Sequence, residues 1–88
     1  MSINSIQEYE KFEEKDIYNI LNQTVHFSEK PQILFYGKGN FGIYGYLQIA
    51  NKTFYFEIRI NKLMRQNEYA ITVKIGKMII VKKVQKVI

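Results

Sequence analysis

A change of hydrophobic periodicity at the single proline, Pro31, divides the sequence into two parts. Before it, from Ser5 to about Val25, there is neither glycine nor proline, and apolar residues recur at helical spacing. After it, apolar and polar residues alternate in short stretches separated by turn residues, which is typical of β-strands. The 88 residues are enough for one domain and too few for two. We therefore predict a single α+β domain over residues 1–88, in which an N-terminal helix packs on an antiparallel sheet.

The expected helix has two candidate starting points. Ser5 followed by Glu8 fits a capping box, in which each side chain bonds a free backbone N–H of the other residue. Asp16 is a candidate cap for a second segment, because acidic side chains favour the positive end of a helix. The sequence is therefore compatible with one long helix and with two shorter helices separated by a break near Lys15–Asp16.

Four to five strands are expected after Pro31. The stretches with strand character are Ile33–Tyr36, Phe41–Ala50, Thr53–Ile60, Glu68–Ile75 and Met78–Val87. Short turns at 37–40, 51–52 and 76–77 join most of them, and only 61–67 is a longer excursion. Parallel strands need long crossover connections, so these short turns predict an antiparallel β-meander, in which each strand pairs with the next one in sequence.

The turn Asn51-Lys52 predicts how the two longest strands pair, because Asn tolerates the left-handed backbone of a tight hairpin. With this turn Ala50 faces Thr53, and the expected core pairs are Ile49–Phe54, Leu47–Phe56, Gly45–Ile58 and Ile43–Ile60. The expected pairs on the other face are Gln48–Tyr55, Tyr46–Glu57 and Tyr44–Arg59. Alternate residues of 68–75 extend both faces of this sheet.

The face opposite the core is the candidate functional surface. The residues that we predict to bind nucleic acid or another partner are Tyr44, Tyr46, Tyr55, Arg59, Lys74, Lys82 and Lys83. Aromatic rings stack on unpaired bases, and Arg and Lys neutralise phosphates. The alternative is an ordinary solvated face, because Tyr, Thr, Lys and Arg are also frequent on exposed strands.

The charges are unevenly distributed along the chain, whose net charge is +5. Residues 1–30 contain six acids and three lysines, net −3, whereas residues 31–88 contain two acids and ten bases, net +8. A basic half attracts polyanions such as nucleic acids. The alternatives are solubility and attraction between an acidic helix and a basic sheet. Lys82, Lys83 and Lys86 form a basic edge that either contacts phosphate or discourages sheet-to-sheet aggregation.

No catalytic residue, cofactor or metal site is predicted. There is no cysteine, and the single histidine, His26, has no ligand spacing with the scattered carboxylates. His26 is either a general base or a residue that contacts carbonyls at the helix end. Glu57 and Arg59 are either a base and a phosphate-binding group or a pair that arises by chance. Gly37–Asn40 is expected to be a turn and not a phosphate cradle, because it lacks the sequence of a P-loop.

The expected location is the cytoplasm, without a membrane partner. No apolar run approaches the ~20 residues of a membrane-spanning helix, and the N-terminus lacks the pattern of a signal peptide. Ile79 and Val81 put apolar groups on the outer face of the last strand. They need cover from the far end of the helix, from the loop around Leu63–Met64 or from a second chain, so a homodimer through the C-terminal strand is one interpretation.

Three functions follow from these features. The preferred one is a non-enzymatic module that docks on nucleic acid or on a nucleoprotein complex, in the manner of small phage or mobile-element inhibitors and modulators. The second is a metal-independent ribonuclease, because a helical segment followed by an antiparallel sheet resembles the architecture of RelE-type toxins and barnase-like nucleases. That resemblance implies catalytic side chains on the exposed sheet face, where Glu57, Arg59 and Lys74 are expected. The third is a protein-binding inhibitor or immunity-type protein.

Overall fold

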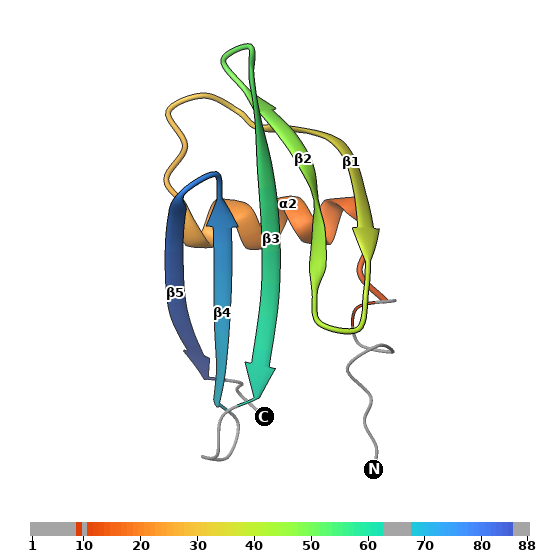
Figure 1. The fold of residues 1–88 in the computed structure, drawn as a ribbon. Helices are drawn as coiled ribbons and strands as arrows, with labels where there is room; N and C mark the ends of the chain where they lie inside the picture. The colour runs from red at the N-terminus through yellow and green to blue at the C-terminus, as the bar shows by residue number, and fades with distance from the viewer. Residues whose placement is uncertain (1–8, 10, 63–67, 86–88) are drawn as a thin grey trace.

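The computed structural model describes residues 9, 11–62 and 68–85. In this part of the chain one helix, α2 (Glu14–Thr24), packs against a five-stranded antiparallel sheet. The strands are neighbours in sequence order: β1 (Gln32–Lys38), β2 (Ile43–Ile49), β3 (Lys52–Lys62), β4 (Glu68–Ile75) and β5 (Met78–Gln85). Figure 1 shows α2 crossing behind the sheet, and the connection to β1 returning along one end of the sheet. The predicted helix on an antiparallel meander is confirmed.

The start of α2 is held by Asp16, whose carboxylate accepts a hydrogen bond from the backbone N–H of Glu13 at 2.8 Å. Glu14 and Asp16 also place negative charge in the first turn, where the helix dipole favours it. A segment boundary with Asp16 as its cap was one of the two alternatives from the sequence; α2 begins here, but Asp16 is its third helical residue and not the cap itself. The predicted capping box of Ser5 and Glu8 lies outside the described residues.

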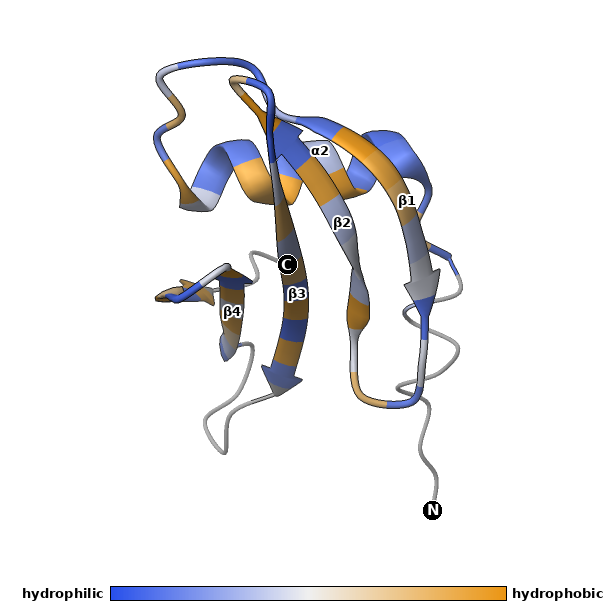
Figure 2. Cartoon of the chain, turned by 45° about the horizontal axis from the view of Figure 1, so that its top comes forward, coloured by the Kyte–Doolittle hydropathy of each residue, from blue (hydrophilic) through white to orange (hydrophobic). Residues whose placement is uncertain are grey.

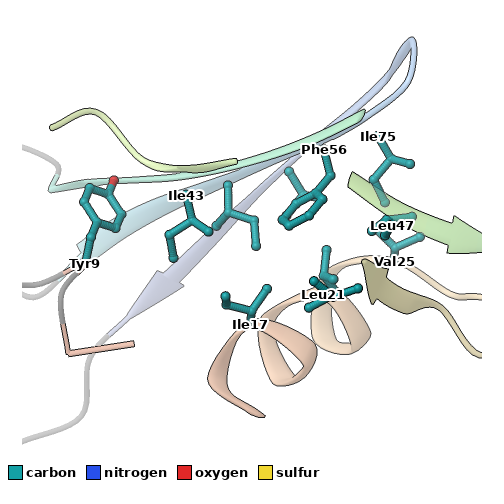
Figure 3. Close-up of a cluster of buried hydrophobic side chains, with 11 residues drawn as sticks. Tyr9, Ile17, Leu21, Val25, Ile43, Leu47, Phe56 and Ile75 are labelled. Atoms are coloured by element: carbon teal, nitrogen blue, oxygen red, sulfur yellow. The ribbon is translucent and has the colours of Figure 1, made fainter. Parts of the chain in front are cut away.

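The core lies between α2 and one face of the sheet. Ile17 and Leu21 extend from α2 toward Phe56 and its neighbours on the sheet (Figure 3). The side chains that are less than 2% exposed are Phe56, Ile17, Leu21, Ile43, Leu47, Ile58 and Val73. Hydrophobic and hydrophilic bands alternate along β3 (Figure 2), so only every second side chain faces α2. Each large apolar side chain buried in this way contributes about 1.5–3 kcal/mol.

The turn between β2 and β3 differs by one residue from the prediction. Its central residues are Ala50 and Asn51, with φ angles of 52° and 67°, and Ile49 pairs with Lys52. A tight two-residue turn of this kind needs the left-handed conformation at both central positions. Asn51 supplies it at the second position, whereas the prediction placed Asn51 first.

The corrected turn moves β3 by two residues relative to β2. On the face opposite the core the pairs are Tyr44–Glu57 and Tyr46–Tyr55, whereas the prediction gave Tyr44–Arg59 and Tyr46–Glu57. Side chains alternate with a period of two, so a shift of two residues changes the neighbours and leaves each side chain on its predicted face.

The first strand, β1, is longer than predicted and contains an irregularity. Its register with β2 shifts between Ile33 and Phe35, so Leu34 is the extra residue of a β-bulge. The turn after β1 spans Gly39–Gly42 and is closed by a hydrogen bond of 2.8 Å from the Gly39 N–H to the Gly42 carbonyl. The predicted turn at 37–40 is therefore displaced by two residues.

The last two strands follow the prediction closely. β4 has the predicted bounds, and Ile75 pairs with Met78 across the turn at 76–77. The loop around Leu63–Met64 and the predicted end of the last strand at Val87 lie outside the described residues. Among the described residues no helix has the length and apolar character that crossing a membrane requires.

Candidate nucleic-acid interface

The sheet has a second face that α2 does not cover, which we call the open face. Its side chains alternate with the core residues along β2, β3, β4 and β5. The described residues of this face that carry aromatic, charged or large apolar side chains are Phe35, Tyr44, Tyr46, Tyr55, Glu57, Arg59, Glu68, Lys74, Ile79, Val81 and Lys83. Exposed apolar side chains that are grouped on one face mark a binding surface more often than isolated exposed hydrophobic residues do.

Three aromatic rings form a row across β1, β2 and β3. Phe35 pairs with Tyr46, and Tyr46 pairs with Tyr55. The ring centroids are 5.3 Å apart in the first pair and 5.7 Å apart in the second, with tilted and edge-on geometry. The three residues are 59%, 41% and 37% exposed, so the rings stabilise one another while each keeps area for a partner.

A row of polar side chains lies beside the aromatic row. The Tyr55 hydroxyl donates a hydrogen bond of 2.7 Å to Oε2 of Glu57, and Nη2 of Arg59 lies 3.7 Å from Oε1. The hydrogen bond to Glu57, partial burial and the negative charge of Glu57 all raise the pKa of Tyr55 above its ordinary 10.0. Tyr55 and Arg59 thus both contact the Glu57 carboxylate, and Lys74 faces it from β4.

A hollow of about 350 Å³ lies at the end of the open face. The turn Gly39–Gly42 forms one side, and the other side is formed by Tyr44, Tyr55, Glu57 and Arg59. The ring of Tyr44 lies against Gly39, where an added Cβ would be 2.8 Å from the Tyr44 hydroxyl oxygen. Glycine at position 39 therefore lets the Tyr44 ring lie directly against the backbone of the turn.

The structure divides the seven predicted binding residues between the two sides of the sheet. Six lie on the open face: Tyr44, Tyr46, Tyr55, Arg59, Lys74 and Lys83. Lys82 faces the opposite side, where it pairs with Ile71 and its Nζ donates a hydrogen bond of 3.1 Å to the Gln23 carbonyl near the end of α2. Adjacent strand residues point to opposite faces, so Lys82 and Lys83 cannot share one surface.

Sequence reasoning missed two aromatic residues of this region, Phe35 and Phe41. Phe35 reaches the open face because the bulge at Leu34 changes the alternation of β1. Phe41 is 79% exposed in the turn beside the hollow, although the sequence assigned it to a strand. The signal that could have found Phe35 is the run Ile33–Tyr36, which is apolar on both faces of an edge strand.

The remaining predicted residues do not assemble a second site in the described part of the chain. His26 is exposed in the connection between α2 and β1. The described residues contain no group of three His, Cys, Asp or Glu side chains that could hold a metal ion. Ile79 and Val81 are each 61% exposed on the open face, so α2, which packs on the other face, does not cover them.

Comparison with known proteins identifies a viral relative. The chain is 32% identical over 66 residues to Uncharacterized protein 81 of Sulfolobus islandicus rod-shaped virus 1, and the match covers 75% of each protein. No family model and no solved structure matches the sequence. The viral source of the relative is compatible with the predicted phage or mobile-element type. The identity and coverage together show that this chain belongs to the family of that viral protein.

Proposed function

We propose that the open face binds single-stranded nucleic acid, as a small non-enzymatic module that blocks or modulates a nucleic acid or a nucleoprotein complex. The observation that carries this proposal is the row Phe35–Tyr46–Tyr55, whose exposed rings share the open face with Arg59 and Lys74. Aromatic side chains on a sheet accept unpaired bases by stacking, and nearby cations contact the phosphates.

The distribution of charge supports an anionic partner. Residues 31–88 carry net +8, and the acids in the first turn of α2, Glu14 and Asp16, belong to the helix on the other side of the sheet. Among the described residues, the open face itself holds three bases, Arg59, Lys74 and Lys83, and two acids, Glu57 and Glu68. Phosphate contacts are therefore few, and we expect modest affinity, with a Kd of about 1–100 µM near physiological salt.

The shape of the open face favours single strands over duplexes. Reading a duplex requires a helix or a two-stranded ribbon that enters a groove, whereas the described open face is the broad surface of a five-stranded sheet. Its rings are accessible only to bases that are not stacked inside a double helix.

The test is a titration of the protein with fluorescent single-stranded RNA and DNA at about 50 and 200 mM salt. We expect binding with a slope of log K against log salt near −2, because three cations each contribute about −0.7. A gel of the recovered RNA completes the experiment. Cleaved RNA would replace this proposal with the ribonuclease, and no binding at low salt would direct the search to a protein partner.

Variants of Tyr46 separate stacking from simple charge attraction. Tyr46→Ser removes the central ring, and we expect it to weaken binding by about 1–3 kcal/mol, the usual contribution of one stacked base. Tyr46→Phe keeps the ring and should bind like the unchanged protein. Equal affinity of the two variants would show that the aromatic row is not part of the interface.

A further inference from the structure

The hollow at the end of the open face contains a carboxylate in an unexpected place. Glu57 lies among the cations Arg59 and Lys74, where a negative charge repels the phosphates that those cations attract. A carboxylate in an interface for nucleic acid contributes favourably when it accepts hydrogen bonds from the N–H groups of a base. From this geometry we infer that the hollow is a subsite for one unpaired guanine, which Glu57 recognises; the inference rests on the proposed function.

The carboxylate of Glu57 is positioned to accept hydrogen bonds from a base. Its side chain is 25% exposed, Oε2 accepts the hydrogen bond of Tyr55, and Oε1 lies 3.7 Å from Arg59. A carboxylate has about four acceptor positions, so each oxygen keeps capacity for a further donor. Because two neighbours already fix its orientation, little side-chain entropy is lost when a base binds.

Guanine fits this group better than the other bases do. Its Watson–Crick edge presents two adjacent donors, N1–H and the N2 amino group, which match the two oxygens of a carboxylate. Adenine and cytosine present one amino group beside a ring nitrogen that accepts, and this nitrogen would face the second oxygen of Glu57. Uracil presents a single N–H between two carbonyl oxygens, which a carboxylate repels.

The walls of the hollow suit a planar base. Tyr44 lies on one side, and the exposed ring of Phe41 belongs to the turn on the other. The volume of about 350 Å³ lies at the lower end of the range of small-ligand sites, about 300–1,000 Å³. Arg59, whose side chain is 55% exposed, lines the same hollow and offers a cation to a phosphate of the bound strand.

The experiment compares four short RNAs that differ only in the central base: UUGUU, UUAUU, UUCUU and UUUUU. Affinities are measured by fluorescence anisotropy at low salt. We expect UUGUU to bind about 5- to 150-fold more tightly than the others, the range of one bidentate base contact.

Two matched variants test the role of Glu57. Glu57→Gln keeps the size of the side chain but offers one acceptor and one donor, so the guanine preference should disappear. Because the substitution also removes a negative charge, UUUUU should bind equally well or more tightly, an outcome that loss of folding cannot produce. Glu68→Gln makes the same change of charge on the open face away from the hollow, and it should keep the preference.

The outcomes separate this inference from the proposed function. Equal, salt-dependent binding of all four RNAs would overturn the guanine subsite and leave the open face as a non-selective interface. A preference that survives Glu57→Gln, or one that Glu68→Gln also abolishes, would overturn the role of Glu57. Binding of none of the four would overturn the proposed function and the subsite with it.

Discussion

The tyrosine hydroxyl groups have different roles on the two sides of the sheet. On the helix side they complete hydrogen bonds that the strands leave open. β3 extends past its last pairing with β2, at Ile58, and there the Tyr9 hydroxyl accepts the N–H of Ile60 at 2.9 Å and donates to its carbonyl at 3.3 Å. Tyr18 of α2 accepts the N–H of Ile33 at 2.7 Å. Partly buried backbone groups thereby find partners that a longer sheet would otherwise supply.

On the open face the Tyr55 hydroxyl instead fixes Glu57, and its titration reports that contact. Glu57→Gln should lower the pKa of Tyr55 toward the ordinary 10.0, because the variant removes the hydrogen bond to the carboxylate and its negative charge. An alkaline titration of phenolate absorbance measures the change, and Tyr55→Phe identifies which of the transitions belongs to Tyr55. Identical titration curves for the unchanged protein and Glu57→Gln would contradict the contact.

The same contact gives a pH dependence of stability whose sign is fixed. A raised pKa means that the folded state binds the phenol proton more tightly than the unfolded state does. The contribution of Tyr55 to the free energy of unfolding is therefore complete below pH 10 and is lost as the pH rises through the raised pKa. Glu57→Gln should remove this part of the alkaline destabilisation in urea unfolding.

At the scale of the elements, the alternation in the sequence predicts the faces of the strands but not their neighbours. Ile43, Leu47, Phe56 and Ile58 lie on the predicted core face although each has a partner two residues away from the predicted one. A shift of two residues preserves every burial, so the hydrophobic pattern cannot detect it. Only the backbone of the turn at Ala50 and Asn51 distinguishes the two registers, and an alanine with positive φ is not predictable from residue preferences.

In the candidate site, too, the sequence predicts the face on which a side chain lies but not the contacts that it makes. The tyrosines and Arg59 lie on the face that the alternation predicts, since they belong to the two strands with the clearest pattern. The contact between Tyr55 and Glu57 joins residues two apart on one strand, and its geometry depends on side-chain rotamers that the sequence does not reveal. Phe35 was missed because a bulge interrupts the period on which the prediction depends.

The close packing of β1 on β2 at Gly45 gives a prediction for these elements. A Cβ added to Gly45 would lie 2.1 Å from the Phe35 carbonyl oxygen and 2.7 Å from the Tyr36 Cα, both backbone atoms. Gly45→Ala should therefore displace β1 and lower the free energy of unfolding by about 1–3 kcal/mol or more, as overpacking usually does. Urea unfolding followed by circular dichroism measures the change.

Gly37→Ala is the matched control for this substitution. It lies on β1, and its added Cβ would be 3.5 Å from a Tyr44 ring carbon, which is ordinary contact. We expect a change in the free energy of unfolding of about 0.5 kcal/mol or less, as for most surface substitutions. Equal destabilisation by Gly45→Ala and Gly37→Ala would show that the close approach of β1 and β2 at Gly45 is not the reason why a larger side chain destabilises the protein there.

The whole molecule has a structural side, where α2 covers the sheet, and an open side with aromatic and basic groups. The two adjacent lysines of β5 fall on different sides of this division. Lys82 holds the end of α2 through the Gln23 carbonyl, and a cation at this end of a helix is also favoured by the dipole. Lys83 pairs with Ala70 on the open face, in line with Thr72 and Lys74 along β4 and β5.

The variants Lys82→Gln and Lys83→Gln therefore test whether RNA binding depends on the open face or on the net charge of the protein. Each variant lowers the net charge from +5 by the same amount. Lys83→Gln should make the salt slope of RNA binding shallower by about 0.7, the contribution of one phosphate contact. Lys82→Gln should leave that slope unchanged and lower the free energy of unfolding by about 0.3–1 kcal/mol, because the end of α2 loses its cation. If both variants reduced the salt slope equally, long-range attraction to the net charge would explain the binding. This outcome would contradict the open face as the interface. A reduced slope for Lys83→Gln alone would locate the phosphates on the side of the sheet that α2 leaves uncovered.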